Sequence, residues 1–564
     1  MKEKIKNILL EASGSFRKNL PEGQPFVFDV NYPANPQFGN YASNIALVLA
    51  KSAKMSPVEV ATQIVSNIDQ ALFKKIEVVK PGFINLTLKE EVLVDLLNNK
   101  PQTIKKEEKI LLEYFQPNIA KPLHIGHLRT ALIGDALYRI FEYLGYNVHS
   151  DTHMGDWGTQ FGVLILAYKK YGDKSIVEKE PIAELNKLYV QINKEIEQNP
   201  NLHEQAKQEF VKLEQGDKEN RDIWKQFVDW SMEKFVAIDE LVGTKVFTQD
   251  DKHHHWPESF FEDKMPAVVE ELKAKKILVQ SRGAWIVDLD EQKLGVAIIV
   301  KSDGGTTYLL RDLATFIFCK EDQGFVNHLY VVDNRQSLHY KQLFAILKLM
   351  GRMGDFEGKH IDYGFISFKG EALSTRKGNM VLAEDVLIEA QTRVVKIIEE
   401  KNPTLANKQD VIKQVAIAVL KYFDLSHNRH SDIEFDWEEA LSFEGNSGPY
   451  LQYSYARLAS ILRKESAKEL HVIEEMTETE RGLLFKLSIM DEKASEVLQE
   501  YYPNLFANYL YELATLINKF YHESPVLKET DETKKQFRLA LAAKAKDVFG
   551  QGLQLLGIQP LEEM

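Results

Sequence analysis

The sequence predicts an α/β protein in which a parallel-sheet domain lies between a small α+β unit and an all-α helical bundle. The first observation is a buried strand ending at residues 110–112, a helix at 128–144 and a second strand at 146–149, which together make a βαβ unit. The second is an alternating strand at 78–88, typical of a sheet edge. The third is that long apolar-periodic helices, without strand patterns, follow residue 405.

The composition is that of an ordinary soluble protein with several domains. Its 564 residues are 44% hydrophobic and 27% charged, and a chain of this length divides into more than one core. No apolar run has the length of a membrane span and the N-terminus is amphipathic, so a cytoplasmic protein without a membrane partner is expected. The net charge of −13 means that any RNA must be bound by local basic stretches, such as 463–468 and 534–546.

The domain boundaries follow from composition and pattern. Residues 1–100 are expected to form the α+β unit, 101–436 the parallel-sheet domain and 437–564 the bundle. A charged, proline-interrupted stretch at 98–109 indicates the first linker. The charged helical segment near 169–240 has no strand signal and is followed by further strands, so we expect a helical insertion in the second domain.

The most specific stretch reads Pro-Asn-Ile-Ala-Lys-Pro-Leu-His-Ile-Gly-His-Leu-Arg from Pro117 to Arg129. A strand that stops at proline and continues as a helix directs free N–H groups and the positive end of a helix dipole at a ligand, an arrangement that binds phosphate. His124 and His127 can donate hydrogen bonds to phosphate oxygens, and Gly126 lets a base or ribose approach the backbone. The alternative for a bare His-x-Gly-His is a helix start with two solvated histidines, but the whole string favours a nucleotide site.

This string resembles the nucleotide motif of the class I aminoacyl-tRNA synthetases, and its flanks are similar to the arginine-specific family. A Gly-Asp-Trp-Gly element within 151–162 is similar to that family as well. Residues 38–41 and 81–85 resemble its N-terminal domain, which contacts the tRNA elbow, and 448–457 and 509–514 resemble its anticodon-binding helices. The resemblance implies a Rossmann-like catalytic domain that activates L-arginine with ATP and passes it to the 3′-terminal ribose of tRNA(Arg).

The resemblance also assigns two sets of site residues. It implies that ATP is bound by Pro117, Asn118, His124, Gly126, His127, Arg376 and Lys377, and arginine by Glu113, Asn118, Tyr308, Asp312 and Gln336. A guanidinium group has five donors in a rigid fork and needs carboxylates placed for bidentate bonds, which fits Glu113 and Asp312. The alternative for these two carboxylates is ion pairing with a neighbouring cation such as Arg311.

The catalytic loop departs from the pattern of the class. Where most class I synthetases have Lys-Met-Ser-Lys-Ser, this chain has Ala-Leu-Ser-Thr-Arg at 372–376, with Thr375 in place of the second lysine. The charge on the reacting phosphates must then be balanced from elsewhere. The residues expected to act in catalysis are His124, His127, Lys121 and Lys377, with Lys121 as the replacement for the missing loop lysine.

No resident metal is expected. ATP is a substrate that brings Mg²⁺, and the single cysteine, Cys319, excludes a thiolate zinc site. The run His253-His-His255 lacks partners at ligand spacing, so we expect a solvated loop. The chain is expected to be a monomer.

Two other functions use the same motif. One is a nucleotidylyltransferase of the same superfamily acting on a small metabolite, but such an enzyme needs no large helical RNA-binding tail. The other is a catalytically silent RNA-binding relative, but the intact motif and all five arginine positions argue against it. A cysteine-specific synthetase would need metal-binding cysteines that this chain lacks.

Overall fold

A parallel five-stranded sheet is the centre of the computed structural model, which describes residues 1–18, 26–99, 103–354, 356–369 and 381–564. Its order is β12-β11-β5-β6-β7, and each neighbouring pair is parallel. The strands are β5 (Lys109–Glu113), β6 (Asn147–Asp151), β7 (His253–His254), β11 (Phe325–Asp333) and β12 (Glu357–Tyr363). The chain leaves β5 toward β6 on one side and later adds β11 on the other, so the carboxyl ends of β5 and β11 mark the switch point where such sheets bind ligands.

Alternate residues of β5 enter two different cores. Leu112 packs in the core that contains helix α6 (Ile125–Tyr143), whereas Leu111 packs in the core that contains α13 (Tyr308–Glu321) and α14 (Ser337–Leu349). Because side chains alternate along a strand, Glu113 shares the α13 face with Leu111. The predicted α/β class and βαβ unit are confirmed.

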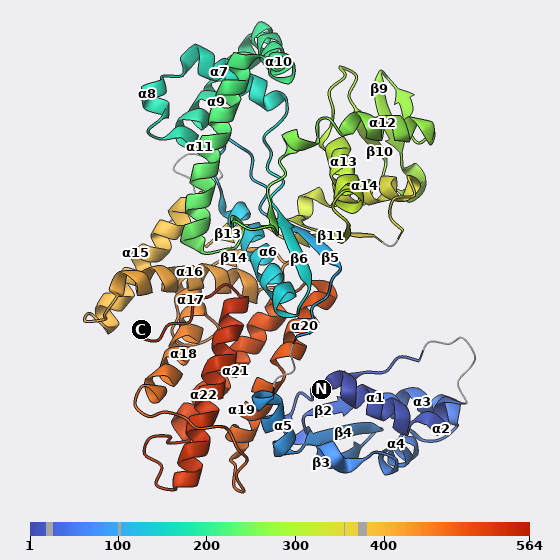
Figure 1. Ribbon diagram of the computed structural model, residues 1–564, viewed down its shortest axis with the longest axis vertical. Helices are drawn as coiled ribbons and strands as arrows, with labels where there is room; N and C mark the ends of the chain where they lie inside the picture. Colours follow the sequence, from blue (N-terminus) through green and yellow to red (C-terminus); the bar gives the residue numbers. More distant parts are fainter. Residues whose placement is uncertain (19–25, 100–102, 355, 370–380) are drawn as a thin grey trace.

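Two insertions rise from the carboxyl edge of the sheet (Figure 1). The first lies between β6 and β7 and contains α7 (Thr159–Tyr171), α8 (Lys174–Val177), α9 (Pro181–Gln198), α10 (Pro200–Glu214) and α11 (Lys218–Val242). The second combines α12 (Met265–Ala274) with an antiparallel sheet in the order β10-β9-β8. Its strands are β8 (Val279–Ser281), β9 (Ala284–Asp288) and β10 (Val296–Val300), and β9 and β10 form an antiparallel hairpin.

The N-terminal unit combines an antiparallel sheet, in the order β1-β2-β4-β3, with short helices. The strands are β1 (Val30–Asn31), β2 (Tyr41–Ser43), β3 (Phe73–Val79) and β4 (Phe83–Leu88), and the helices include α1 (Lys2–Ala12), α3 (Ile45–Ala53), α4 (Pro57–Ser66) and α5 (Glu90–Asn98). The side chains of Tyr32 and Tyr41 donate hydrogen bonds to Glu492. Tyr41 is therefore a core residue, and it ties this unit to the C-terminal helices.

The C-terminal helices form the predicted bundle and share a core with α6. They are α16 (Lys408–Ser426), α18 (Gly448–Leu462), α19 (Glu478–Ser488), α20 (Met490–Glu500), α21 (Pro503–Glu523) and α22 (Glu532–Leu555). At the junction, the buried Lys421 ammonium donates to the carbonyl oxygens of Gly243 (3.0 Å) and Gly557 (2.7 Å), at the ends of α11 and α22. It also lies 4.0 Å from Asp135 of α6, so one cation joins the insertion, the bundle and the central domain.

Two short strands differ from the sequence expectations. The run His253-His-His255 is not a solvated loop, because His253 and His254 form the edge strand β7 and His253 is buried. In addition, β14 (Ile433–Phe435) pairs in parallel with β13 (Ile366–Phe368), in a region where no strand was expected. Strands of two or three residues depend on their neighbours rather than on a local pattern.

Among the described residues, no helix combines the length and the apolar composition needed to cross a membrane.

Candidate functional site

The two motif histidines organise the N-terminus of α6. His124 is its N-cap, where the N–H of Gly126 donates to His124 Nδ1 and the N–H of His124 donates to His127 Nδ1, both at 3.1 Å. The rings stack with their centroids 3.8 Å apart. Because each Nδ1 accepts a bond, the proton of each neutral imidazole lies on Nε2. Both rings therefore present an N–H to a ligand.

The local environment keeps these imidazoles neutral. Burial, together with the charges of the nearby His124 and Lys121, lowers the pKa of His127 to about 3. Burial also lowers the pKa of His124, helped by the charge of Arg335. Near neutral pH the pair therefore supplies hydrogen-bond donors rather than formal charges.

A cavity of about 340 Å³ opens beside these histidines. Its lining includes His124, Ile125, Gly126, Arg129, Asp333, Arg335, Val381 and residues 363–368. The N–H of Ile125 donates to the carbonyl oxygen of Val381 at 3.0 Å, which joins the segment that begins at 381 to the start of α6. Arg376 and Lys377, predicted to bind ATP from this side, lie outside the described residues. The cavity has the position expected for the nucleotide, at the carboxyl edge of the sheet.

Arg129 fixes the wall of this cavity. Its buried guanidinium donates to the carbonyl oxygens of Gly364 (2.6 Å) and Phe365 (3.0 Å), and its Nε lies 3.4 Å from a carboxylate oxygen of Asp424. Nearby, Arg335 forms a two-point ion pair with Asp333 and is largely exposed. The sequence analysis did not identify Arg335. Because Arg335 lines the cavity beside His124, it adds a positive charge to that cavity.

Lys121 lies close to the motif but is directed toward the first insertion. Its Nζ is 5.7 Å from the centre of the Tyr189 ring on α9, and its charge contributes to the lowered pKa of His127. The lysine predicted to act in catalysis is thus near the N-terminus of α6.

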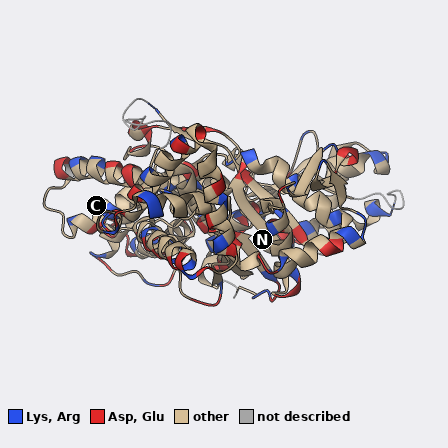
Figure 2. Ribbon diagram, turned by 90° about the horizontal axis from the view of Figure 1, so that it is seen from above, with Lys and Arg blue, Asp and Glu red and all other residues tan. Residues whose placement is uncertain are grey.

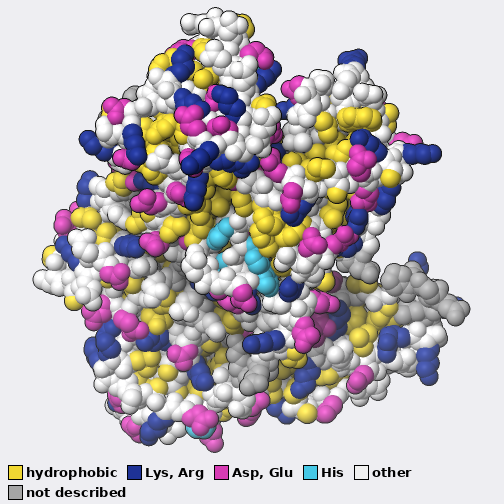
Figure 3. All heavy atoms as spheres, turned by 45° about the horizontal axis from the view of Figure 1, so that its top comes forward, with side chains coloured by type: hydrophobic (Ala, Val, Ile, Leu, Met, Phe, Trp, Pro, Cys, Tyr) yellow, Lys and Arg dark blue, Asp and Glu magenta, His cyan; other side chains and the backbone are white. Residues whose placement is uncertain are grey.

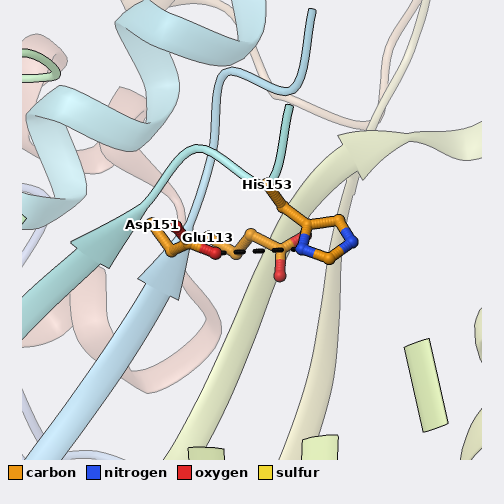
Figure 4. Close-up of side chains that lie close together, drawn as sticks. All are labelled: Glu113, Asp151 and His153. Atoms are coloured by element: carbon orange, nitrogen blue, oxygen red, sulfur yellow. Dashed lines mark ion pairs between the residues drawn. The ribbon is translucent and has the colours of Figure 1, made fainter. Parts of the chain in front are cut away.

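The second half of the site is a buried cluster of carboxylates. Glu113 and Asp151 end the neighbouring strands β5 and β6 at the same register, so their side chains lie together on the α13 face of the sheet (Figure 4). A carboxylate oxygen of Glu113, a carboxylate oxygen of Asp151 and a ring nitrogen of His153 all lie within 4.8 Å of one another. Asp312 of α13 completes the cluster, because its Oδ1 lies 3.7 Å from His153 Nε2.

Each carboxylate has a different electrostatic environment. Burial raises the pKa of Glu113 to about 7, and the charge of Asp312 also raises it, whereas His153 lowers it. Burial and the Glu113 charge raise the pKa of Asp151 well above its usual range. Burial opposes ionisation of Asp312 too, but the hydrogen bond and charge of His339 outweigh it, so the pKa of Asp312 lies below its usual value. The cluster therefore carries negative charge that a cation would stabilise.

The other predicted arginine contacts surround this cluster at the sheet edge. Tyr308 is the first residue of α13, one turn before Asp312, and its side chain is 67% exposed. Asn118 is exposed and bridges to Gly155, where an added Cβ would lie 2.4 Å from Asn118 Oδ1. Gln336 is exposed at the turn after β11. Pro117 is buried, and its carbonyl oxygen accepts the N–H of Gly155.

The structure adds side chains that the sequence did not assign to the site. They are Asp151, His153, Glu258 and His339. Glu258 lies 3.5 Å from Arg311, and burial raises its pKa to about 7 although Arg311 lowers it. Asp151 could have been predicted from the sequence, because it ends β6, the strand that pairs with β5. His153 follows two residues later, in the loop after β6. Glu258 and His339 join the site only through their contacts with Arg311 and Asp312 of α13. In the space-filling view, histidine side chains gather in the hollow below the two insertions (Figure 3).

Family models match most of the chain in three parts. The model described as "tRNA synthetases class I (R), catalytic domain" matches residues 90–437, "Arginyl tRNA synthetase N terminal domain" matches 1–88 and "DALR anticodon binding domain" matches 451–564. The arginine–tRNA ligase of Alkaliphilus metalliredigens is 37% identical over 553 residues, with 95% of each chain covered. That of Clostridium kluyveri is 38% identical over 568 residues, covering 98% of this chain and 99% of the relative.

Solved structures agree with this assignment. The crystal structure of arginyl-tRNA synthetase from Plasmodium falciparum matches with a TM-score of 0.83 at 25% identity, covering 100% of this chain and 99% of the other. The Thermus thermophilus arginyl-tRNA synthetase shares the fold, with a TM-score of 0.83 at 24% identity and both chains fully covered. Fold and site thus define a class I aminoacyl-tRNA synthetase. Within that class, the chain belongs to the arginine–tRNA ligase family.

Proposed function

We propose that the protein activates L-arginine with ATP and then esterifies the 3′-terminal ribose of tRNA(Arg). In the first step an arginine carboxylate oxygen attacks the α-phosphate of Mg²⁺-bound ATP, forming arginyl-adenylate and releasing pyrophosphate. In the second step a ribose hydroxyl attacks the acyl carbon and AMP leaves. The observation that supports this is the placement of a phosphate-binding helix end and a cation-binding carboxylate cluster at one edge of one sheet.

The residues of the chain act mainly by alignment and electrostatics. The α6 N-terminus and the Nε2–H groups of His124 and His127 hold phosphate oxygens. Lys121, with Arg376 and Lys377 of the catalytic loop, balances the charge that develops on the α-phosphate and pyrophosphate. Glu113 and Asp312 receive the guanidinium, while Asn118 and Gln336 hold the α-amino and carboxylate groups and Tyr308 covers the stem. This arrangement converts a reaction of separate molecules into one of aligned groups.

The test of the proposed function is ATP–pyrophosphate exchange with each amino acid, with and without total tRNA. Exchange with arginine alone among the amino acids is the expected result. Exchange without any amino acid preference, or adenylylation of a small metabolite instead, would favour the nucleotidylyltransferase alternative. Absence of any exchange, together with retained tRNA binding, would favour the silent RNA-binding alternative.

The pKa of Glu113 predicts that arginine affinity rises from pH 6 to pH 8. Burial, and the charge of Asp312, raise that pKa to about 7, so below this value the carboxyl group is largely protonated. Because the guanidinium binds the ionised carboxylate of Glu113, arginine binding below this pH must release a proton from that group. Affinity should therefore fall by up to about tenfold per pH unit below the pKa. Calorimetric titration across this range measures it, and a dissociation constant independent of pH would contradict the role of Glu113.

tRNA binding should depend on local cations, since acidic and basic residues are interspersed along the chain (Figure 2). Several cations of the stretches 463–468 and 534–546 are already paired: Arg463 with Glu563, Lys534 with Glu475, Lys535 with Glu465 and Lys546 with Glu562. A cavity of about 540 Å³ lies elsewhere, lined by residues of α15 (Ala383–Lys401), α18 and α21 that include Tyr453 and Arg457. An arginine beside a half-exposed tyrosine suits a stacked base and its phosphate.

We expect Arg457→Gln to weaken tRNA(Arg) binding by about tenfold and to reduce the slope of log affinity against log salt by about one. Filter binding of the full chain at several salt concentrations measures both quantities. The full chain is needed because the bundle shares a core with α6. Arg463→Gln is the matched control, since that guanidinium is already paired with an acidic residue. Equal effects of the two substitutions would rule out a specific contact at Arg457.

A further inference from the structure

The carboxylate cluster contains one more carboxylate than the arginine contacts implied by the family resemblance. Glu113 and Asp312 come from β5 and α13, and Asp151 comes from the end of β6 at the same register as Glu113. Asp151 is fully buried. A buried carboxylate beside another carboxylate is costly unless a cation shares the space.

The hydrogen bonds of the cluster are unequally distributed. Glu113 Oε2 lies 3.0 Å from His328 Nε2, whose Nδ1 lies 2.9 Å from the Tyr330 hydroxyl. Asp312 Oδ2 is hydrogen-bonded to His339. Asp151 Oδ1 accepts the N–H of Trp256 at 2.9 Å. In contrast, Asp151 Oδ2 accepts no hydrogen bond from any described residue.

The imidazole ring of His153 lies between Asp151 and Asp312 and is also without hydrogen-bond partners among the described residues. Its Nδ1 lies 3.9 Å from Asp151 Oδ2 and its Nε2 lies 3.7 Å from Asp312 Oδ1, both too long for hydrogen bonds. Both ring nitrogens are buried without a hydrogen-bond partner among the described residues. The residue also has a φ of 37°, a left-handed conformation that is unusual for a side chain of this size and typical of functional loops.

We propose that Asp151 is a third, specificity-determining carboxylate of the arginine pocket, with Oδ2 receiving an N–H of the guanidinium. This inference rests on the proposed function, because it assigns a residue to the same pocket. Glu113 Oε2 and Asp312 Oδ2 already have hydrogen-bond partners in the protein. Asp151 Oδ2 is buried and has no partner among the described residues, so its donor would come from the ligand. A guanidinium has donors on two edges and can reach more than two carboxylates. A neutral ureido group in the same place has fewer donors and no charge.

The test compares arginine with citrulline, its neutral ureido isostere, by calorimetric titration of the full chain. Asp151→Asn keeps the acceptor for the Trp256 N–H and removes the carboxyl group that can ionise when a guanidinium binds beside it. Its arginine dissociation constant should rise about thirtyfold or more, as expected for loss of one partner of a desolvated charge pair. The dissociation constant for citrulline should change less than about threefold. Arginine binding within about threefold of wild type would overturn the proposal.

Asp156→Asn is the matched control, since Asp156 lies on the same loop but both its oxygens are bonded to Ser259, at 2.8 Å and 2.6 Å. This variant should retain arginine binding. Equal losses in both variants, or an equal loss of arginine and citrulline in Asp151→Asn, would indicate a structural role and overturn the proposal. A thermal unfolding midpoint close to wild type shows that the pocket is still folded. Failure of the wild-type chain to bind arginine would instead contradict the proposed function itself.

Discussion

Replacing Asp312 by asparagine is expected to weaken arginine binding by about a hundredfold or more, the loss expected when a desolvated charge pair is broken. Asp312 is the carboxylate of the cluster best kept ionised, because the hydrogen bond and charge of His339 hold its pKa below the usual value in spite of burial. An asparagine keeps the shape but offers an uncharged oxygen and an N–H₂ group that would face the guanidinium donors. ATP affinity should change little, since the nucleotide cavity is lined by other residues.

Asp322→Asn at the exposed C-terminal end of the same helix is the control for this prediction. It removes an acidic charge from α13 without touching the cluster, so arginine affinity should remain that of the wild type. Arginine and ATP dissociation constants are measured separately for each variant. Equal losses for both substrates in Asp312→Asn, or no loss for arginine, would rule out the assigned pocket.

The parts of the fold that follow local patterns were predictable from the sequence. The apolar run that ends β5 and the helix pattern after it gave the βαβ unit, and the helical periodicity after residue 405 gave the bundle. The edge strand β7 was missed, because its histidines are polar and only the parallel neighbour β6 makes them a strand. β14 was missed for the same reason, since its partner β13 lies far away in sequence. Pairing over such distances is set by tertiary contacts.

The site was predictable where one segment carries it. His124, Gly126 and His127 lie together at the start of α6, so the motif alone identified the helix end that is proposed to bind phosphate. The carboxylate cluster instead combines residues that are distant in sequence, and Asp151 meets Glu113 because of strand register. His339 meets Asp312 only because α14 packs beside α13. Which groups hold the charge, and which acceptor is left without a donor, depends on burial and cannot be read from residue types.

Lys121→Met is expected to lower the rate of arginyl-adenylate formation by about a hundredfold or more, the loss typical of one preorganised donor to a transition state. The loop residue that supplies this charge in most of the class is replaced here by Thr375, whereas Lys121 lies near His127 and influences its pKa. Its ammonium lies 5.7 Å from the centre of the Tyr189 ring, a weak contact that phosphate can replace. Apparent ATP affinity should change much less, because the contact tightens only as charge develops.

Single-turnover measurement of adenylate formation, with tRNA present and all substrates saturating, determines this rate directly. Lys187→Met is the control, because Lys187 is an exposed lysine on the same helix as Tyr189 and its loss should not alter the rate. If Lys121→Met forms arginyl-adenylate at a rate within a few-fold of wild type, the positive charge must instead come from Lys377 or Lys369. Of these two, Lys369 is ion-paired with Asp436 at 2.7 Å and would have to leave that partner to act. A large loss in Lys121→Met with unchanged ATP affinity would therefore locate the replacement charge before the first motif histidine rather than in the loop.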